Sequence, residues 1–225
     1  MLDQDHFSSY AMGHWLRSDG SGRQVCSAVT GETLGVLGAV PDVAAMRGYA
    51  KTHGGAALRA MNFHDRARMF KALALHLKAH RTALYDLSFL TRATLADSQI
   101  DIDGGIGTLL VYASKGRREM PEGFVLLDGE VEMLSRDGSF LGQHVLTPRQ
   151  GIALQINAFN FPVWGMLEKL APSLLAGVPS LVKPASDTGY LTQAVVRLIA
   201  DSGILPVGAL QLIMGATGDL LDCLD

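Results

Sequence analysis

Several features that mark particular classes of protein are scarce or missing in this sequence. Its 225 residues include two cysteines, Cys26 and Cys223, far apart and outside any Cys-x-x-Cys spacing, so neither a disulfide framework nor a zinc site is expected. The longest weakly polar stretch, 170–182, is broken by two prolines and a glycine and falls short of the roughly 20 apolar residues that a membrane-spanning helix needs. The net charge of -3 offers no basic surface for nucleic acid. Small molecules are therefore the expected ligands.

The composition is that of a globular protein with a large core, because 48% of the residues are hydrophobic and 18% are charged. Residues 1–5 carry acidic rather than basic side chains and lead into no apolar run, so a secretory signal is not expected. The cytoplasm is the expected location.

Strand-like patterns occur in two regions of the first 150 residues. Residues 13–38 predict short strands in a hairpin region, with turn residues at 18–22 and 29–32. Residues 124–149 alternate between apolar and polar side chains on both sides of a turn at 136–139, which predicts a second hairpin.

Helical spacing of apolar residues dominates the segment between these hairpins. From Val43 to about residue 95 the spacing predicts amphipathic helices, with interruptions near Gly54-Gly55 and at Asn62. A further helix is expected to begin after Asp103-Gly104-Gly105 and to end near Arg118, ahead of a proline and a glycine.

Three short apolar runs, 151–156, 180–183 and 210–214, alternate with helical segments in the last third of the chain. This order is typical of βαβ units, so the sequence predicts an α/β fold with a parallel sheet. The expected division is an N-terminal part of strands and helices, a protruding hairpin, and the first part of a nucleotide-binding βαβ domain, at 1–123, 124–150 and 151–225 respectively.

The segment Asp101-Ile102-Asp103-Gly104 has some likeness to a calcium-binding loop. However, the first ligand position would be Gln99, and the twelfth would be Leu110 where a bidentate Glu is required. The segment is interpreted as a solvated turn that caps the following helix, and no metal site is expected.

The loop that follows the first parallel strand, 157–162, is a candidate binding site. The sequence contains neither a G-x-G-x-x-G dinucleotide fingerprint nor a P-loop. Instead, Asn157, Phe159 and Asn160 follow the strand at its carboxyl end, where open α/β sheets bind ligands. The residues alone leave open a second interpretation, in which both Asn side chains stabilise turns or cap a helix.

Three motifs in order and spacing resemble those of the aldehyde dehydrogenase superfamily: 156–162 (Ile-Asn-Ala-Phe-Asn-Phe-Pro), 168–177 (Glu-Lys-Leu-Ala-Pro-Ser-Leu-Leu-Ala-Gly) and 182–185 (Val-Lys-Pro-Ala). Further segments, among them 101–109 and 164–169, resemble the members that oxidise CoA-linked semialdehydes in bacterial phenylacetate and benzoate degradation. The resemblance covers the whole chain. It implies the superfamily's fold, with the 124–150 hairpin used for homo-oligomer formation.

The resemblance also implies roles for individual residues. Asn160 would donate a side-chain N–H to the oxyanion of the thiohemiacetal intermediate. Lys169 matches a lysine that either assists proton relay or forms a structural salt bridge. The expected cofactor-binding residues are Ile156, Ala158 and Phe159 in the cleft, Lys183 and Ser186 at the adenosine ribose, and Gly215 and Gly218 at the next strand-to-helix turn.

Ser186 departs from the superfamily's common pattern, in which an acidic residue follows Lys-Pro-Ala. A carboxylate at this position accepts hydrogen bonds from the ribose 2′-hydroxyl and repels a 2′-phosphate. Its absence, with Lys183 nearby, favours NADP as the cofactor, with NAD still possible.

The superfamily's catalytic Cys and general-base Glu are expected downstream of the segment that resembles residues 210–225. Cys223 stands among acidic residues, which disfavour a thiolate, so it is not expected to replace the nucleophile. The leading hypothesis is thus the N-terminal part of an NADP-dependent dehydrogenase that acts on a CoA-linked semialdehyde. The alternative is a short non-catalytic chain that binds nucleotide or pairs with full-length subunits.

Overall fold

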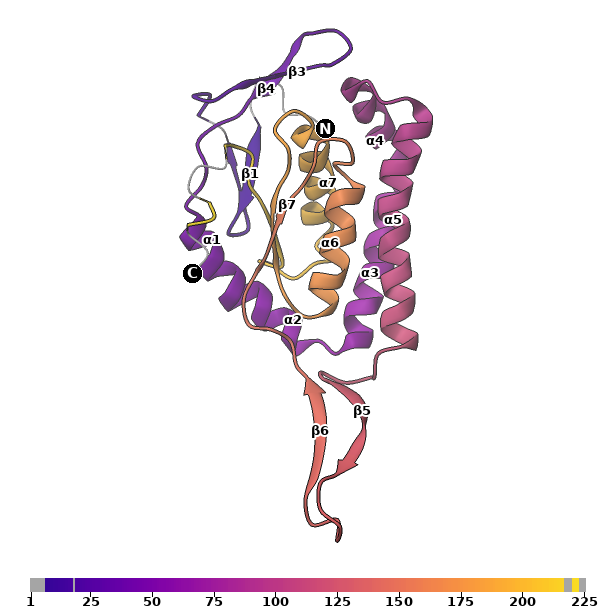
Figure 1. The fold of residues 1–225 in the computed structure, drawn as a ribbon. Helices are drawn as coiled ribbons and strands as arrows, with labels where there is room; N and C mark the ends of the chain where they lie inside the picture. The colour runs from indigo at the N-terminus through magenta and orange to yellow at the C-terminus, as the bar shows by residue number, and fades with distance from the viewer. Residues whose placement is uncertain (1–6, 18, 217–219, 223–225) are drawn as a thin grey trace.

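The main sheet of the molecule combines parallel and antiparallel strands (Figure 1). The structure is a computed structural model that describes residues 7–17, 19–216 and 220–222. Strands β7 (Ala153–Ile156), β8 (Ser180–Lys183) and β9 (Leu210–Leu212) pair in parallel. The order within the described sheet is β2-β1-β9-β8-β7. The predicted α/β fold and its three parallel strands are confirmed.

The first strands differ from the prediction. Strand β1 (Ser8–Ala11) joins the sheet antiparallel to β9 and pairs with β2 (His14–Arg17). The strand that pairs with β2 therefore comes before it in the sequence. The hairpin turn predicted at 18–22 does not connect two strands that pair with each other. Strand β1 was not predicted because its buried residues include serines, which do not form an apolar pattern. Their polar groups are paired with distant residues, and the Ser8 N–H donates to Gln193 Oε1 at 2.9 Å.

A separate two-stranded sheet follows, formed by β3 (Gln24–Cys26) and β4 (Thr33–Val36). Its turn at 29–32 agrees with the prediction. Gly31 has φ +76°, a left-handed conformation that favours glycine.

The next segment is helical without a break as far as residue 60. Helix α1 (Val43–Tyr49) continues through a π-helical turn, η1 (Ala50–Gly55), into α2 (Ala56–Ala60). The interruption predicted near Gly54-Gly55 is a π-helical turn that ends at Gly55, and the chain does not leave the helix there. A Cβ at Gly54 would lie 2.1 Å from the Gly208 carbonyl oxygen, so glycine here permits close packing rather than a turn. The predicted interruption at Asn62 is confirmed, since Asn62 is the N-cap of α3 (Phe63–Ala79).

Helices α4 (Arg81–Ser88), η2 (Phe89–Thr91) and α5 (Leu95–Arg118) follow. The expected start of the last helix after Gly105 is wrong by about three turns, because α5 begins at Leu95 with a capping box formed by Thr94 and Asp97. The glycines lie inside α5. Each costs a helix about 1 kcal/mol relative to alanine, which tertiary contacts offset.

The two faces of the sheet are covered by different helices. On one face, Leu181 and Ile213 share a cluster with Met46 of α1. On the other face, Val182 and Leu212 belong to the larger core formed with α6 (Trp164–Leu175) and α7 (Gly189–Ser202). Helices α3 and α5 pack beyond α6 as an outer layer (Figure 1). Within the described part of the chain, no helix is long and apolar enough to cross a membrane.

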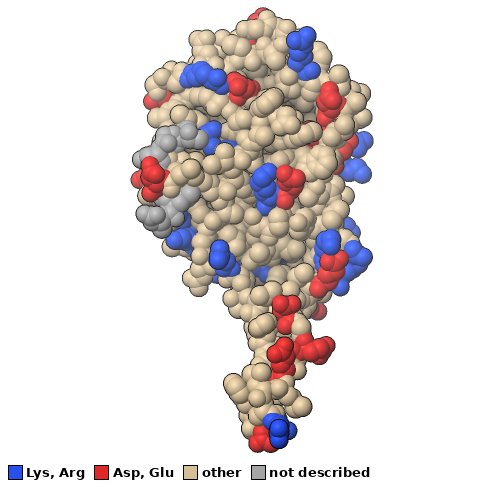
Figure 2. Space-filling view, in the orientation of Figure 1, with Lys and Arg blue, Asp and Glu red and all other residues tan. Residues whose placement is uncertain are grey.

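The second predicted hairpin is confirmed. Strands β5 (Leu126–Met133) and β6 (Leu141–Leu146) pair with each other and project from the body (Figure 1). Its exposed side chains are both acidic and apolar, and Figure 2 shows acidic residues along its length. On the face seen in Figure 2, charges of both signs are scattered over the body.

Candidate functional site

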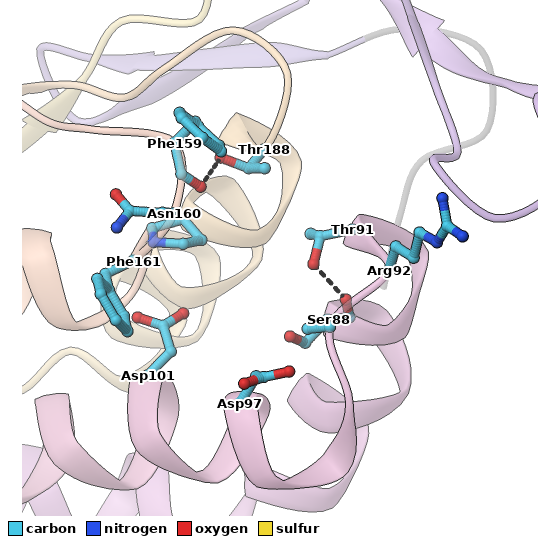
Figure 3. Close-up of a pocket in the computed structure, with 11 residues that line it drawn as sticks. Ser88, Thr91, Arg92, Asp97, Asp101, Phe159, Asn160, Phe161 and Thr188 are labelled. Carbon is cyan, nitrogen blue, oxygen red and sulfur yellow. Dashed lines mark hydrogen bonds between the residues drawn. The ribbon is translucent and has the colours of Figure 1, made fainter.

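The loop from Asn157 to Val163 connects β7 to α6 at the carboxyl end of the parallel strands. Its two asparagines point to different environments. Asn157 is buried, and its amide has no hydrogen-bond partner among the described residues. Asn160 is exposed, and within residues 7–17, 19–216 and 220–222 no group pairs with its amide (Figure 3). The helix-capping interpretation of Asn160 is therefore not supported, since the N-cap of α6 is Val163, and Asn160 is open to solvent.

Side chains at the start of α7 hold this loop in place. Thr188, which precedes α7, donates its hydroxyl to the Phe159 carbonyl oxygen at 2.8 Å (Figure 3). Thr192, on α7, donates to the Pro162 carbonyl oxygen at 3.0 Å. Both hydrogen bonds fix the backbone on either side of Asn160, because each binds a carbonyl of the loop.

From the opposite side, Asp101 of α5 binds the end of the loop. Its Oδ1 accepts hydrogen bonds from the Trp164 N–H at 2.7 Å and from the Val163 N–H at 3.2 Å. Burial raises the pKa of the Asp101 carboxyl to about 6, against the two backbone hydrogen bonds that lower it. The interpretation of 101–104 as a solvated turn is wrong, because Asp101 is buried within a helix.

A pocket of about 240 Å³ lies between the loop and the α4–α5 junction (Figure 3). Asn160, Asp101 and Thr188 line it together with Ser88 and Arg92. Sequence reasoning found Asn160 but missed Asp101 and Thr188. A usable signal was the spacing Asp101-x-x-Gly104-Gly105, which places a carboxylate and two small residues on one helical face.

The residues predicted to line a cofactor cleft are exposed beside Asn160. Ile156 is 52% and Phe159 is 65% exposed, and Ala158 is exposed as well. Large apolar side chains in such positions, at the end of parallel strands, are typical of a surface that a ligand or a further part of the protein covers.

The two residues predicted at the adenosine ribose follow β8. Lys183 is buried, its Nζ donates to the Pro184 carbonyl oxygen at 2.6 Å, and burial lowers the pKa of its ammonium group. Ser186 is half-buried. The carboxylate of its neighbour Asp187 forms an ion pair with Arg23.

Other predicted site residues have different surroundings. Lys169 is exposed, and its Nζ lies 2.8 Å from the Gly165 carbonyl oxygen and 3.0 Å from Glu168 Oε1, which agrees with the salt-bridge alternative. At Gly215, a Cβ would lie 2.8 Å from the Gly38 carbonyl oxygen, so a neighbouring segment accounts for this glycine. Gly218 and Cys223 lie outside the described residues.

Comparison with known proteins identifies the family. A family model described as the aldehyde dehydrogenase family matches residues 15–224. The chain belongs to the aldehyde dehydrogenase family. The resemblance found in the three motifs is therefore confirmed.

Among curated relatives of this aldehyde dehydrogenase chain is a 3,4-dehydroadipyl-CoA semialdehyde dehydrogenase of Aromatoleum evansii. It is 42% identical over 217 residues, which are 96% of this chain and 42% of the relative. The chain thus spans less than half the length of that relative.

Solved aldehyde dehydrogenase structures share the fold. Betaine aldehyde dehydrogenase from Staphylococcus aureus in complex with NAD+ superposes with a TM-score of 0.79 at 24% identity, covering 99% of this chain and 42% of that one. Succinate-semialdehyde dehydrogenase from Burkholderia pseudomallei gives a TM-score of 0.78 at 24% identity, covering 93% and 42% of the respective chains.

Proposed function

We propose that these residues form the nucleotide-binding and oxyanion-stabilising part of an enzyme that oxidises an aldehyde to a carboxylate. The observation that carries the proposal is the Asn160 amide. It is exposed and unpaired among the described residues, and it stands in a loop that three side chains from neighbouring elements hold. A donor fixed in this way is suited to a developing oxyanion, because little reorganisation is needed during the reaction.

In the proposed reaction, a cysteine thiolate adds to the aldehyde carbon. This cysteine would belong to the part of the family's fold that lies beyond the residues of this chain. The carbonyl oxygen becomes an oxyanion, to which Asn160 donates an N–H. Loss of a hydride from the carbon leaves a thioester, and water then releases the carboxylate and restores the thiol. Such a donor typically contributes about 3 kcal/mol to the transition state.

A nicotinamide dinucleotide is the proposed hydride acceptor. The surroundings of β7 and β8 fit such a group, because Ile156 and Phe159 expose apolar surface next to Asn160 and Lys183 lies at the carboxyl end of β8. Among the described residues Ser186 has no hydrogen-bond partner for its hydroxyl, and Arg23 neutralises the adjacent Asp187. These features support NADP as the preferred cofactor, since in the described part of the chain the carboxylate next to Ser186 is already paired with a cation.

The proposed substrate is a CoA-linked semialdehyde from aromatic degradation. The support is the 42% identity with a relative whose name describes a CoA semialdehyde dehydrogenase.

We further propose that the β5–β6 hairpin pairs with a second copy. A lone two-stranded hairpin is marginally stable in water, and this one exposes cross-strand apolar neighbours such as Leu127 and Val145.

The catalytic proposal is tested with the protein expressed at its full natural length. Replacement of Asn160 by alanine is expected to lower kcat about 100-fold, with the Kd for cofactor nearly unchanged, because the donor acts on the oxyanion. The matched control is Gln99→Ala, which removes an exposed amide from α5, outside the pocket. Equal turnover by the wild type and the Asn160→Ala variant would refute the role. A wild-type protein that oxidises no aldehyde, CoA-linked or free, would favour the non-catalytic alternative.

The cofactor proposal is tested with Ser186→Glu. Two unit charges about 4 Å apart at an effective dielectric constant of about 20 repel by about 4 kcal/mol, and exposure to solvent reduces this value. We therefore expect kcat/KM with NADP to fall at least tenfold while kcat/KM with NAD is retained. Ser186→Ala is the control for loss of the hydroxyl alone. A wild type that strongly prefers NAD would contradict the proposal.

A further inference from the structure

An acidic residue in the second turn of α5 contacts the functional loop directly. Asp101 is 4% exposed, and its carboxylate accepts hydrogen bonds from the N–H groups of Val163 and Trp164. These two residues follow Asp101 by 62 and 63 positions in the sequence. These N–H groups belong to the first turn of α6, where backbone donors have no partner within the helix. The N-cap residue of α6 is Val163, whose apolar side chain cannot cap the helix, so the start of α6 has no cap from its own N-cap residue. Asp101 therefore caps α6 from another helix.

Two glycines on α5 allow this contact. Gly104 and Gly105 lie three and four residues beyond Asp101, on the same helical face. A Cβ at Gly104 would lie 2.8 Å from Trp164 Cε3, and a Cβ at Gly105 would lie 3.0 Å from Trp164 Cα. Larger side chains would push the start of α6 away from α5. The glycines therefore bring the Trp164 backbone within reach of the Asp101 carboxylate.

The position of Val163 also determines that of Asn160. Only Phe161 and Pro162 lie between them, and the conformations of these two residues are constrained. Pro162 has a fixed φ, and Thr192 holds its carbonyl oxygen. Phe161 makes an edge-to-face contact with Trp164, with ring centroids 6.0 Å apart. A displacement of the α6 N-terminus therefore moves the Asn160 amide as well.

We propose that Asp101 is a positioning residue for Asn160, which it holds in place by fixing the first turn of α6 from α5. The inference rests on the proposed oxyanion role of Asn160 and goes beyond it, since Asp101 itself need not touch the substrate. A misplacement of about 1 Å at a reacting centre can cost about 100-fold in rate.

The test uses the protein at its full natural length and three variants. Asp101→Ala removes both acceptor oxygens and is expected to lower kcat at least about tenfold, with the Kd for cofactor within about twofold of wild type. Asp101→Asn retains one acceptor oxygen and is expected to recover most of the lost turnover. The matched control is Asp103→Asn on the same helix, whose carboxylate accepts from the Tyr85 hydroxyl at 2.6 Å, outside the pocket. Its kcat is expected to equal that of wild type.

Crystal structures of the wild type and of Asp101→Ala decide the positioning role without reference to activity. A shift of the Asn160 backbone relative to β7 supports the inference, and a superposable loop overturns it. Native turnover by Asp101→Ala also overturns it. Failure of the wild type to oxidise any aldehyde is a different result, because it refutes the proposed function and leaves the structural comparison decisive. Where Asp101→Ala does not fold, Asp101→Glu moves the carboxylate by one methylene, and wild-type kcat in that variant counts against the inference.

Discussion

Replacement of Asp101 by asparagine should change how the stability of the protein depends on pH. In the folded protein, burial raises the pKa of Asp101 from 3.8 to about 6, and each pKa unit corresponds to about 1.4 kcal/mol. Ionised Asp101 therefore costs the folded state about 3 kcal/mol relative to an unfolded chain in which the carboxylate is hydrated. The folded state binds more protons than the unfolded state between pH 4 and 6, so this group's contribution to stability falls as pH rises through that range.

The difference between wild type and Asp101→Asn isolates this contribution, because the other titrating groups are shared. Between pH 5 and 7.5, linkage with the two pKa values predicts that wild type loses about 1.4 kcal/mol relative to the variant. Asparagine has a similar shape and one acceptor oxygen for the Trp164 N–H, so the variant is expected to fold. Urea unfolding at several pH values, on the protein at its full natural length, measures the difference.

A constant difference across this pH range would refute the argument, since it would mean that Asp101 has the same pKa in both states. A difference that grows in the opposite direction would show that the backbone hydrogen bonds outweigh desolvation.

Three further changes test the packing. Gly54→Ala places a Cβ 2.1 Å from the Gly208 carbonyl oxygen and should cost roughly 1–3 kcal/mol in the free energy of unfolding, measured in urea; no loss would contradict this close contact. Thr94→Ala removes the capping box of α5 and should cost about 1 kcal/mol, with faster amide exchange confined to the first turn of the helix. Leu127→Asp together with Val145→Asp should lower the oligomeric state in sedimentation, whereas an unchanged mass would count against the hairpin as an interface.

The regular elements were predictable where local pattern and tertiary environment agree. The strands β7, β8 and β9 are short apolar runs, and the β5–β6 hairpin alternates around a turn at Gly138, which has φ +70°. The loop with Asn160 could be located because it follows a parallel strand, and parallel strands present their carboxyl ends at one edge of the sheet.

Prediction failed where a residue's neighbours come from distant parts of the chain. Glycine within a helix is unfavourable by itself, so Gly54 and Gly104 predicted breaks. In the structure, both lie inside helical segments. Glycine is needed at these positions because another segment approaches too closely for a Cβ. Similarly, the serines of β1 do not form an apolar pattern, and their partners are nearly 200 residues away.

The sequence by itself determined the family, the α/β fold and the loop that presents Asn160, because these depend on local composition and on motifs with fixed spacing. Only the tertiary structure decided what holds that loop. Asp101, Thr188 and Thr192 come from two helices that are separated from it by about 30 to 60 residues, as their hydrogen bonds to Trp164, Phe159 and Pro162 show. A carboxylate becomes a helix cap at such a separation only when packing brings two helices together, and local periodicity contains no information on that contact.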